Sequence, residues 1–199
     1  MTPRVLGPSA ATWLREAAQV IAGIDPDAVS RAAVVLVDAW KRDAGIFIAG
    51  NGGSAATASH LALDLQKAGR GPGGRAARAV SLADNLGLVT AWANDVSFDR
   101  VFAEQLEALA RPGDALVVIS VSGSSPNLVA AVGSARRLGL TSVGLLGRTG
   151  GAVRDAVDVA VLVPSDDYGW VESAHVALHH ILTYAVREAA AAAARPATA

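Results

Sequence analysis

The chain has 199 residues, of which 52% are hydrophobic and 18% charged, and its formal net charge is −1. This composition is typical of one globular domain with a full core, and the near-neutral charge argues against a dedicated nucleic-acid surface. The absence of cysteine excludes disulfides and thiolate metal sites. Because residues 1–11 lack the apolar core of a signal peptide and no apolar run is long enough to span a membrane, we expect a cytoplasmic protein.

Two helices are predicted before any strand, in an N-terminal helical segment covering residues 1–43. Residues 9–24 carry apolar side chains at helical spacing, with Ser9 as a candidate N-cap. The second helix begins at Pro26, which follows the candidate N-cap Asp25. These helices either form an oligomer interface or cover one face of a sheet, and the pattern leaves both alternatives open.

An α/β core is predicted over residues 44–166, where short apolar runs alternate with helical stretches. We expect strands over 45–49, 79–82, 115–120, 142–146 and 159–163, and helices over 54–68, 85–93, 98–110, 126–138 and 150–156. Strands separated by helices favour a central parallel sheet with helices on both faces.

Three further segments complete a single domain that spans residues 1–199. Residues 69–78 contain four glycines and three arginines and are predicted to be a mobile loop. A long C-terminal helix is expected over 167–190, starting near Tyr168. The Ala/Pro-rich tail, 191–199, is expected to be disordered.

Two loops follow predicted strands and lead into predicted helices. Residues 50–55 read Gly-Asn-Gly-Gly-Ser-Ala, and residues 120–125 read Ser-Val-Ser-Gly-Ser-Ser. In parallel sheets, ligands bind beyond the carboxyl ends of the strands, where helix N-termini present free N–H groups. Four serine hydroxyls and these N–H groups suit a phosphate, although the glycines could serve only a tight turn and the serines only helix capping.

The first loop also fits the dinucleotide-binding pattern G-x-G-x-x-A, which makes a dinucleotide-binding oxidoreductase a third hypothesis. The acidic residue expected about 20 positions later is not evident, and no G-K-[ST] motif is present. We therefore expect no nucleotide cofactor.

Histidine and carboxylate residues lie on the helices that flank these loops. His60 and Asp64 are four residues apart, and Glu172 shares a helix face with His175, His179 and His180. Such a set suits a divalent metal or acid–base chemistry. We assign function to His60 and His180, and interpret His175 and His179 as polar residues on solvated or intersubunit faces.

The segments IAGNGGSA (48–55) and ISVSGSS (119–125) together resemble the SIS (sugar isomerase) domain, and most closely its phosphoheptose isomerase branch. The resemblance covers nearly the whole chain. It implies a flavodoxin-like three-layer α/β/α sandwich with extra N-terminal helices. It also implies a homotetramer with active sites near subunit interfaces, a zinc cofactor, and conversion of sedoheptulose 7-phosphate to glycero-manno-heptose 7-phosphate through an enediol.

The same resemblance implies roles for individual residues. His60, Asp64, Glu172 and His180 would bind the metal, with His180 as the acid and either Asp64 or Glu172 as the base. The residues implied to contact the substrate are Asn51, Gly52, Gly53, Ser54, Asn94, Asp95, Ser120, Val121, Ser122 and Ser125.

The chain departs from the family pattern at four of the matching positions. Asp64 stands where the family has a glutamate, and Glu172 where it has a glutamine; Val121 replaces a threonine and Thr57 an acidic residue. These differences keep open a second hypothesis, a non-catalytic SIS module that binds sugar phosphates for regulation or binds a replication initiator protein.

Overall fold

The computed structural model describes residues 9–68 and 75–194. Most of the predicted 69–78 loop and of the 191–199 tail lies outside the described residues. The helices are α1 (Ala10–Ala22), α2 (Pro26–Lys41), α3 (Gly53–Ala68), α4 (Leu86–Asp95), α5 (Val101–Leu109), α6 (Pro126–Leu138), α7 (Gly151–Arg154) and α8 (Tyr168–Ala193). The strands are β1 (Gly45–Gly50), β2 (Arg78–Ser81), β3 (Ala115–Ser120), β4 (Thr141–Gly147) and β5 (Val159–Val163).

The five strands form one parallel sheet in the order β2-β1-β3-β4-β5. The chain first moves outward from β1 to β2 and then returns to the other side of β1 to form β3. Strand order therefore reverses between β1 and β3, where Gly50 pairs with Ile119. In doubly wound sheets this is the point at which ligands bind, and here the two predicted loops leave the sheet side by side.

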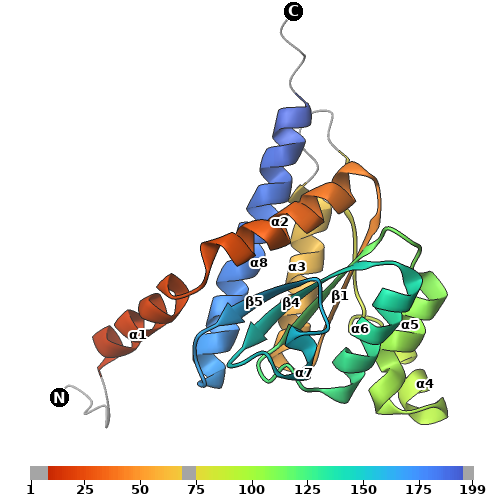
Figure 1. The fold of residues 1–199 in the computed structure, drawn as a ribbon, viewed down its shortest axis with the longest axis horizontal. Helices are drawn as coiled ribbons and strands as arrows, with labels where there is room; N and C mark the ends of the chain where they lie inside the picture. The colour runs from red at the N-terminus through yellow and green to blue at the C-terminus, as the bar shows by residue number, and fades with distance from the viewer. Residues whose placement is uncertain (1–8, 69–74, 195–199) are drawn as a thin grey trace, which may run out of the picture.

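Two apolar cores sandwich the sheet because successive side chains of a strand point to opposite faces. Ile46 and Ile48 of β1 pack in the core beneath α2, α3 and α8. Phe47 and Ala49 pack in the other core, beneath α4, α5 and α6. The result is the expected three-layer α/β/α sandwich, whose layers are visible in Figure 1.

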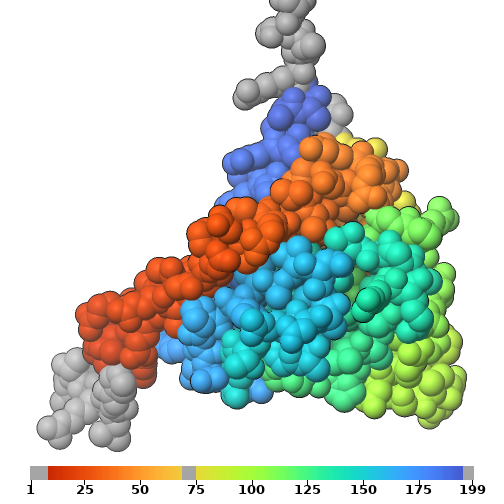
Figure 2. All heavy atoms as spheres, in the orientation of Figure 1, coloured from red at the N-terminus to blue at the C-terminus, as the bar shows by residue number. Residues whose placement is uncertain are grey.

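The two N-terminal helices have different surroundings. Helix α2 begins at the predicted Asp25 cap and buries Ala32, Leu36 and Ala39 against the sheet layer, so it covers a sheet face within the chain. Helix α1 begins at the predicted Ser9 cap, has no buried residue, and projects from the body of the molecule (Figures 1 and 2). Helix α2 therefore has the covering role, and α1 keeps an exposed apolar surface that the rest of the described chain does not cover.

Element boundaries differ from the prediction by a few residues at several ends, including those of three helices. The helix predicted over 98–110 starts as a 3-10 turn, Phe98–Arg100, before α5. Helix α7 is shorter than predicted, because Gly150 has a left-handed backbone that delays its start. Helix α8 continues to Ala193, since alanine has the highest helix propensity. Among the described helices, none has the length and apolar character needed to cross a membrane.

Candidate functional site

The loops after β1 and β3 are held together by a reciprocal pair of amide hydrogen bonds. Asn51 Nδ2 donates to Asn127 Oδ1 at 2.9 Å, and Asn127 Nδ2 donates to Asn51 Oδ1 at 2.8 Å. Asn127 is buried in the first turn of α6, directly after Pro126. The pair fixes the distance between the two loops and therefore the shape of the space between them.

A cavity of 150 Å³ lies between these loops and the start of α8. Its walls contain six of the ten residues predicted to contact the substrate, together with Glu172. The lining residues are Asn51, Ser54, Ile119, Ser120, Val121, Ser122, Ser125, Tyr168 and Glu172. A larger cavity of 610 Å³ lies near the amino end of β1, at Gly45. We place the site at the smaller cavity because ligands of parallel sheets bind at the carboxyl edge.

The serine loop is shaped so that its donors face one space. The Ser120 hydroxyl accepts a hydrogen bond from the Gly123 N–H at 3.0 Å and so tightens the turn. Gly123 has a φ of +62°, and a Cβ there would lie 2.0 Å from the Gly150 carbonyl oxygen, so only glycine fits. Ser125, the N-cap of α6, makes no side-chain capping bond, which leaves its hydroxyl free for a ligand.

Glu172 closes the cavity on the side of α8. Its carboxylate lies directly over Gly53, where a Cβ would come within 2.4 Å of Oε1. The absence of a side chain at Gly53 therefore allows the carboxylate to reach the start of α3. Glu172 is half-buried and faces the same cavity as the serine loop, a position from which a carboxylate can act on a bound ligand.

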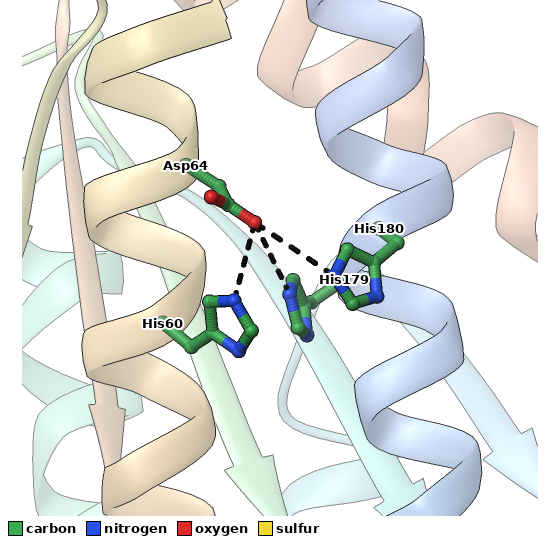
Figure 3. Close-up of side chains that lie close together, drawn as sticks. All are labelled: His60, Asp64, His179 and His180. Atoms are coloured by element: carbon green, nitrogen blue, oxygen red, sulfur yellow. Dashed lines mark ion pairs between the residues drawn. The ribbon is translucent and has the colours of Figure 1, made fainter.

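A second group of side chains lies further along α3 and α8. His60 and Asp64 extend from α3 toward His179 and His180 of α8, and the three imidazoles converge on one carboxylate oxygen (Figure 3). From Asp64 Oδ2 the distances to Nε2 are 3.5 Å for His60, 3.5 Å for His179 and 3.9 Å for His180. Nitrogen and oxygen donors grouped in this way could hold a divalent metal.

His175 and His179 are fully buried, which contradicts their interpretation as residues of solvated or intersubunit faces. Burial lowers the pKa of His175 to about 4, opposed in part by the Leu146 backbone carbonyl. Burial, followed by the charges of His180 and His60, lowers the pKa of His179 to about 4, with Asp64 opposing the shift. Both rings are therefore neutral near pH 7, the form in which histidine binds metals.

The predicted site residues fall into three groups in the structure. Six of the eight substrate-contact residues predicted in the two loops line the cavity, whereas Gly52 and Gly53 are exposed beside it. Asn94 and Asp95 are exposed at the end of α4, hydrogen-bonded to each other at 2.8 Å, and do not line the cavity. The four predicted metal ligands do not converge as one set, because Glu172 is outside the group that contains His60, Asp64 and His180.

Three polar residues of the site were not predicted from the sequence, namely Asn127, Tyr168 and His179. A signal existed for His179: at 100° per residue it lies about 20° from Glu172 around the helix, whereas His180 lies about 80° away. The only sequence signal for Asn127 was its position after Pro126 at the start of a helix, and this pattern is also common in ordinary helix capping.

Comparisons with known proteins agree with this geometry. The SIS domain family model matches residues 12–147. A phosphoheptose isomerase from Pelobacter propionicus is 40% identical over 174 residues, covering 86% of this chain and 90% of that protein. A solved phosphoheptose isomerase structure from Neisseria gonorrhoeae has a TM-score of 0.82 at 32% identity, and one from Francisella tularensis a TM-score of 0.84 at 27%; each comparison covers 89% of this chain and 96% of the other.

A parallel sheet in the order 2-1-3-4-5, with a serine-lined cavity at its switch point, defines an α/β protein of the flavodoxin-like class. With the family match and the identities above, the chain belongs to the SIS domain family, in its phosphoheptose isomerase branch.

Proposed function

We propose that this protein is a phosphosugar isomerase that converts sedoheptulose 7-phosphate to glycero-manno-heptose 7-phosphate. The observation that carries the proposal is the cavity at the β1/β3 switch point, in which the serine loop and the Glu172 carboxylate face one another. The substrate is suggested by relatives named phosphoheptose isomerase, one of them 40% identical over most of the chain.

The phosphate end of the substrate would be held by the serine loop. Ser122, Ser125 and the N-terminus of α6 supply hydroxyls, N–H groups and a favourable helix dipole for a dianion. Anchoring the phosphate fixes the position of the carbonyl end of the sugar, which converts much of the binding energy into orientation. Asn94 and Asp95, at the same edge of the sheet, are proposed to contact the sugar hydroxyls.

The reaction moves hydrogen between two carbons without net oxidation. A base removes a proton from C1 of the ketose, the electrons of that C–H bond form the C1–C2 double bond, and the C2 oxygen takes up the carbonyl π electrons and a proton, which gives an enediol. A proton is then delivered to C2, where the C1–C2 π electrons form the new C–H bond, while the C1 hydroxyl loses its proton and becomes the aldehyde oxygen. We propose Glu172 or Asp64 as the base and His180 as the acid. Glu172 faces the cavity directly, whereas Asp64 is surrounded by three imidazoles.

We propose that the protein uses zinc, with His60, Asp64 and His180 among the ligands. The cluster offers nitrogen and oxygen donors within 4.8 Å of one another, which fits a divalent metal. A bound zinc ion would polarise the substrate carbonyl and offset the negative charge that develops on its oxygen.

We also propose a homotetramer with active sites near its interfaces, in the cytoplasm. The cavity, at 150 Å³, is smaller than the roughly 300–1,000 Å³ of typical small-molecule sites. A heptose phosphate would therefore extend beyond it, and a second subunit could complete the walls. Exposed apolar residues on α1, Trp13 and Leu14 among them, offer a surface for such assembly.

The test is turnover of a panel of ketose phosphates by the purified protein, with zinc supplied and with a chelator. We expect aldose formation from sedoheptulose 7-phosphate, little from shorter ketose phosphates, and loss of activity with the chelator. Tight binding of the sugar phosphate without turnover, unaffected by His180→Ala, would instead support a non-catalytic regulatory module.

A further inference from the structure

His179 is a polar residue placed in the apolar core without an evident structural reason. Its side chain has no exposed surface, and within the described residues neither of its ring nitrogens has a hydrogen-bond partner. An unpartnered buried polar group disfavours folding, and such groups in native proteins usually have a functional explanation. A bound ligand that accepts coordination from one nitrogen would supply that explanation.

The position of His179 Nε2 fits a metal ligand. With bonds of about 2.0–2.1 Å, two ligand atoms of a tetrahedral zinc ion lie roughly 3.4 Å apart. The distance from Asp64 Oδ2 to His179 Nε2 is 3.5 Å, equal to that from the same oxygen to His60 Nε2. His180 Nε2, at 3.9 Å, is slightly further away, a difference that a small side-chain rotation would remove.

Glu172 occupies a different place. It precedes His179 by seven residues on α8, which corresponds to about 10 Å along the helix axis. Its carboxylate lies over Gly53 and faces the serine-lined cavity. A carboxylate in that position is directed toward the substrate rather than toward the histidine cluster.

We propose that His179, and not Glu172, is the fourth protein ligand of a divalent metal that His60, Asp64 and His180 also bind. Three imidazole nitrogens and one carboxylate oxygen form a donor set that suits zinc and related borderline metals better than magnesium or calcium. Glu172 is then free to act on the substrate, a consequence that rests on the proposed isomerase function. The ligand assignment itself does not depend on turnover.

The test compares two equally buried histidines of the same helix. His175 is also fully buried and lies outside the cluster, so His175→Leu is a matched control for His179→Leu. The full-length proteins are stripped with a chelator, and zinc affinity is measured by competition with a chromophoric chelator. Cobalt absorption spectra report the coordination number independently of any activity.

We expect His179→Leu to weaken zinc binding by more than about 100-fold, beyond the effect typical of residues that only support a ligand. His175→Leu and Glu172→Ala should leave the affinity within about threefold, and wild-type cobalt protein should give the intense spectrum of a tetrahedral site. The apo form of His179→Leu should melt no lower than wild-type apoprotein, because the change removes an unpartnered polar group, but zinc should no longer raise its melting temperature.

The proposal is overturned if wild-type protein binds no zinc, if His175→Leu and His179→Leu weaken binding equally, or if Glu172→Ala costs as much affinity as His60→Ala. If His179→Leu fails to fold, His179→Phe provides the same comparison with a ring that has no donor atom. Zinc binding as predicted without sugar-phosphate turnover would refute the proposed function and leave the ligand assignment standing.

Discussion

Gly53 controls the position of the candidate base, Glu172. A Cβ at residue 53 would overlap the Glu172 carboxylate, so Gly53→Ala should push that carboxylate out of the cavity. A displacement of about 1 Å is enough to lower kcat/KM by roughly 100-fold when the displaced group acts on the substrate. We expect this loss in steady-state kinetics, with unchanged stability in urea unfolding, because alanine favours the helix that residue 53 begins.

Gly133→Ala is the control for this substitution. Gly133 is also helical, and its Cβ would meet only the Arg137 side chain, at 3.8 Å. This variant should keep full activity and gain about 0.5–1 kcal/mol of stability. Equal kcat/KM for Gly53→Ala and the wild type would show that Glu172 does not act on the substrate.

From the sequence, helical spacing predicted some members of the histidine–aspartate cluster on α3 and α8, but not the complete set. His60 and Asp64 are one turn apart and were expected to meet His180, which they do. Glu172 was expected to join them because it shares their side of α8. The angle between two residues around a helix does not show how far apart they lie along its axis. Glu172 and His179 share a face but are seven residues apart, and they belong to the serine-lined cavity and to the histidine cluster, respectively.

His175, in helix α8, makes the stability of the folded protein depend on pH. Burial lowers the pKa of this residue from 6.5 to about 4. The unfolded state therefore binds more protons between these values, so stability is fully present above pH 6.5 and is lost as the pH falls toward 4. For apoprotein we expect a loss of roughly 2 kcal/mol between about pH 7 and pH 5 from this residue.

The measurement is urea unfolding of apoprotein at several pH values in that window. In His175→Leu, the loss of unfolding free energy between about pH 7 and pH 5 should be smaller by roughly 2 kcal/mol, because leucine does not titrate. An unchanged slope in the variant would mean that His175 is protonated as easily in the folded chain as in the unfolded one.

Most elements could be predicted from the sequence because their signals are local. The strand Ala115–Ser120 and the helix Pro126–Leu138 end where predicted, the latter fixed by Pro126 at its start and Gly139 in the left-handed conformation after its end. The different fates of α1 and α2 were not predictable, because both have one apolar face and only tertiary packing decides which face meets the sheet.

At the scale of the whole molecule, α1 presents apolar side chains that the rest of the chain does not cover. Leu14 is 72% exposed and Trp13 41% exposed, and a cavity of 340 Å³ lined by Ile21, Ile24 and Ile181 lies at the end of the same helix. Exposed apolar surface of this kind marks interaction sites. We therefore expect wild-type protein to elute as a tetramer in light-scattering chromatography.

Leu14→Asp should shift that tetramer toward smaller species, because a carboxylate would be buried without a partner in the interface. Gln19→Asp, on the opposite side of α1, adds the same charge and should leave the tetramer intact. A monomeric wild type would refute the assembly.

The central claim is that the chain isomerises a heptose phosphate by proton transfer through an enediol. It is tested most directly by running the reaction in D₂O and observing the product by NMR. We predict that sedoheptulose 7-phosphate yields an aldose 7-phosphate carrying deuterium at C2, and that Glu172→Gln or Asp64→Asn, whichever removes the base, abolishes the exchange. Absence of aldose, or aldose whose C2 hydrogen comes wholly from C1 as in a hydride shift, would contradict the claim.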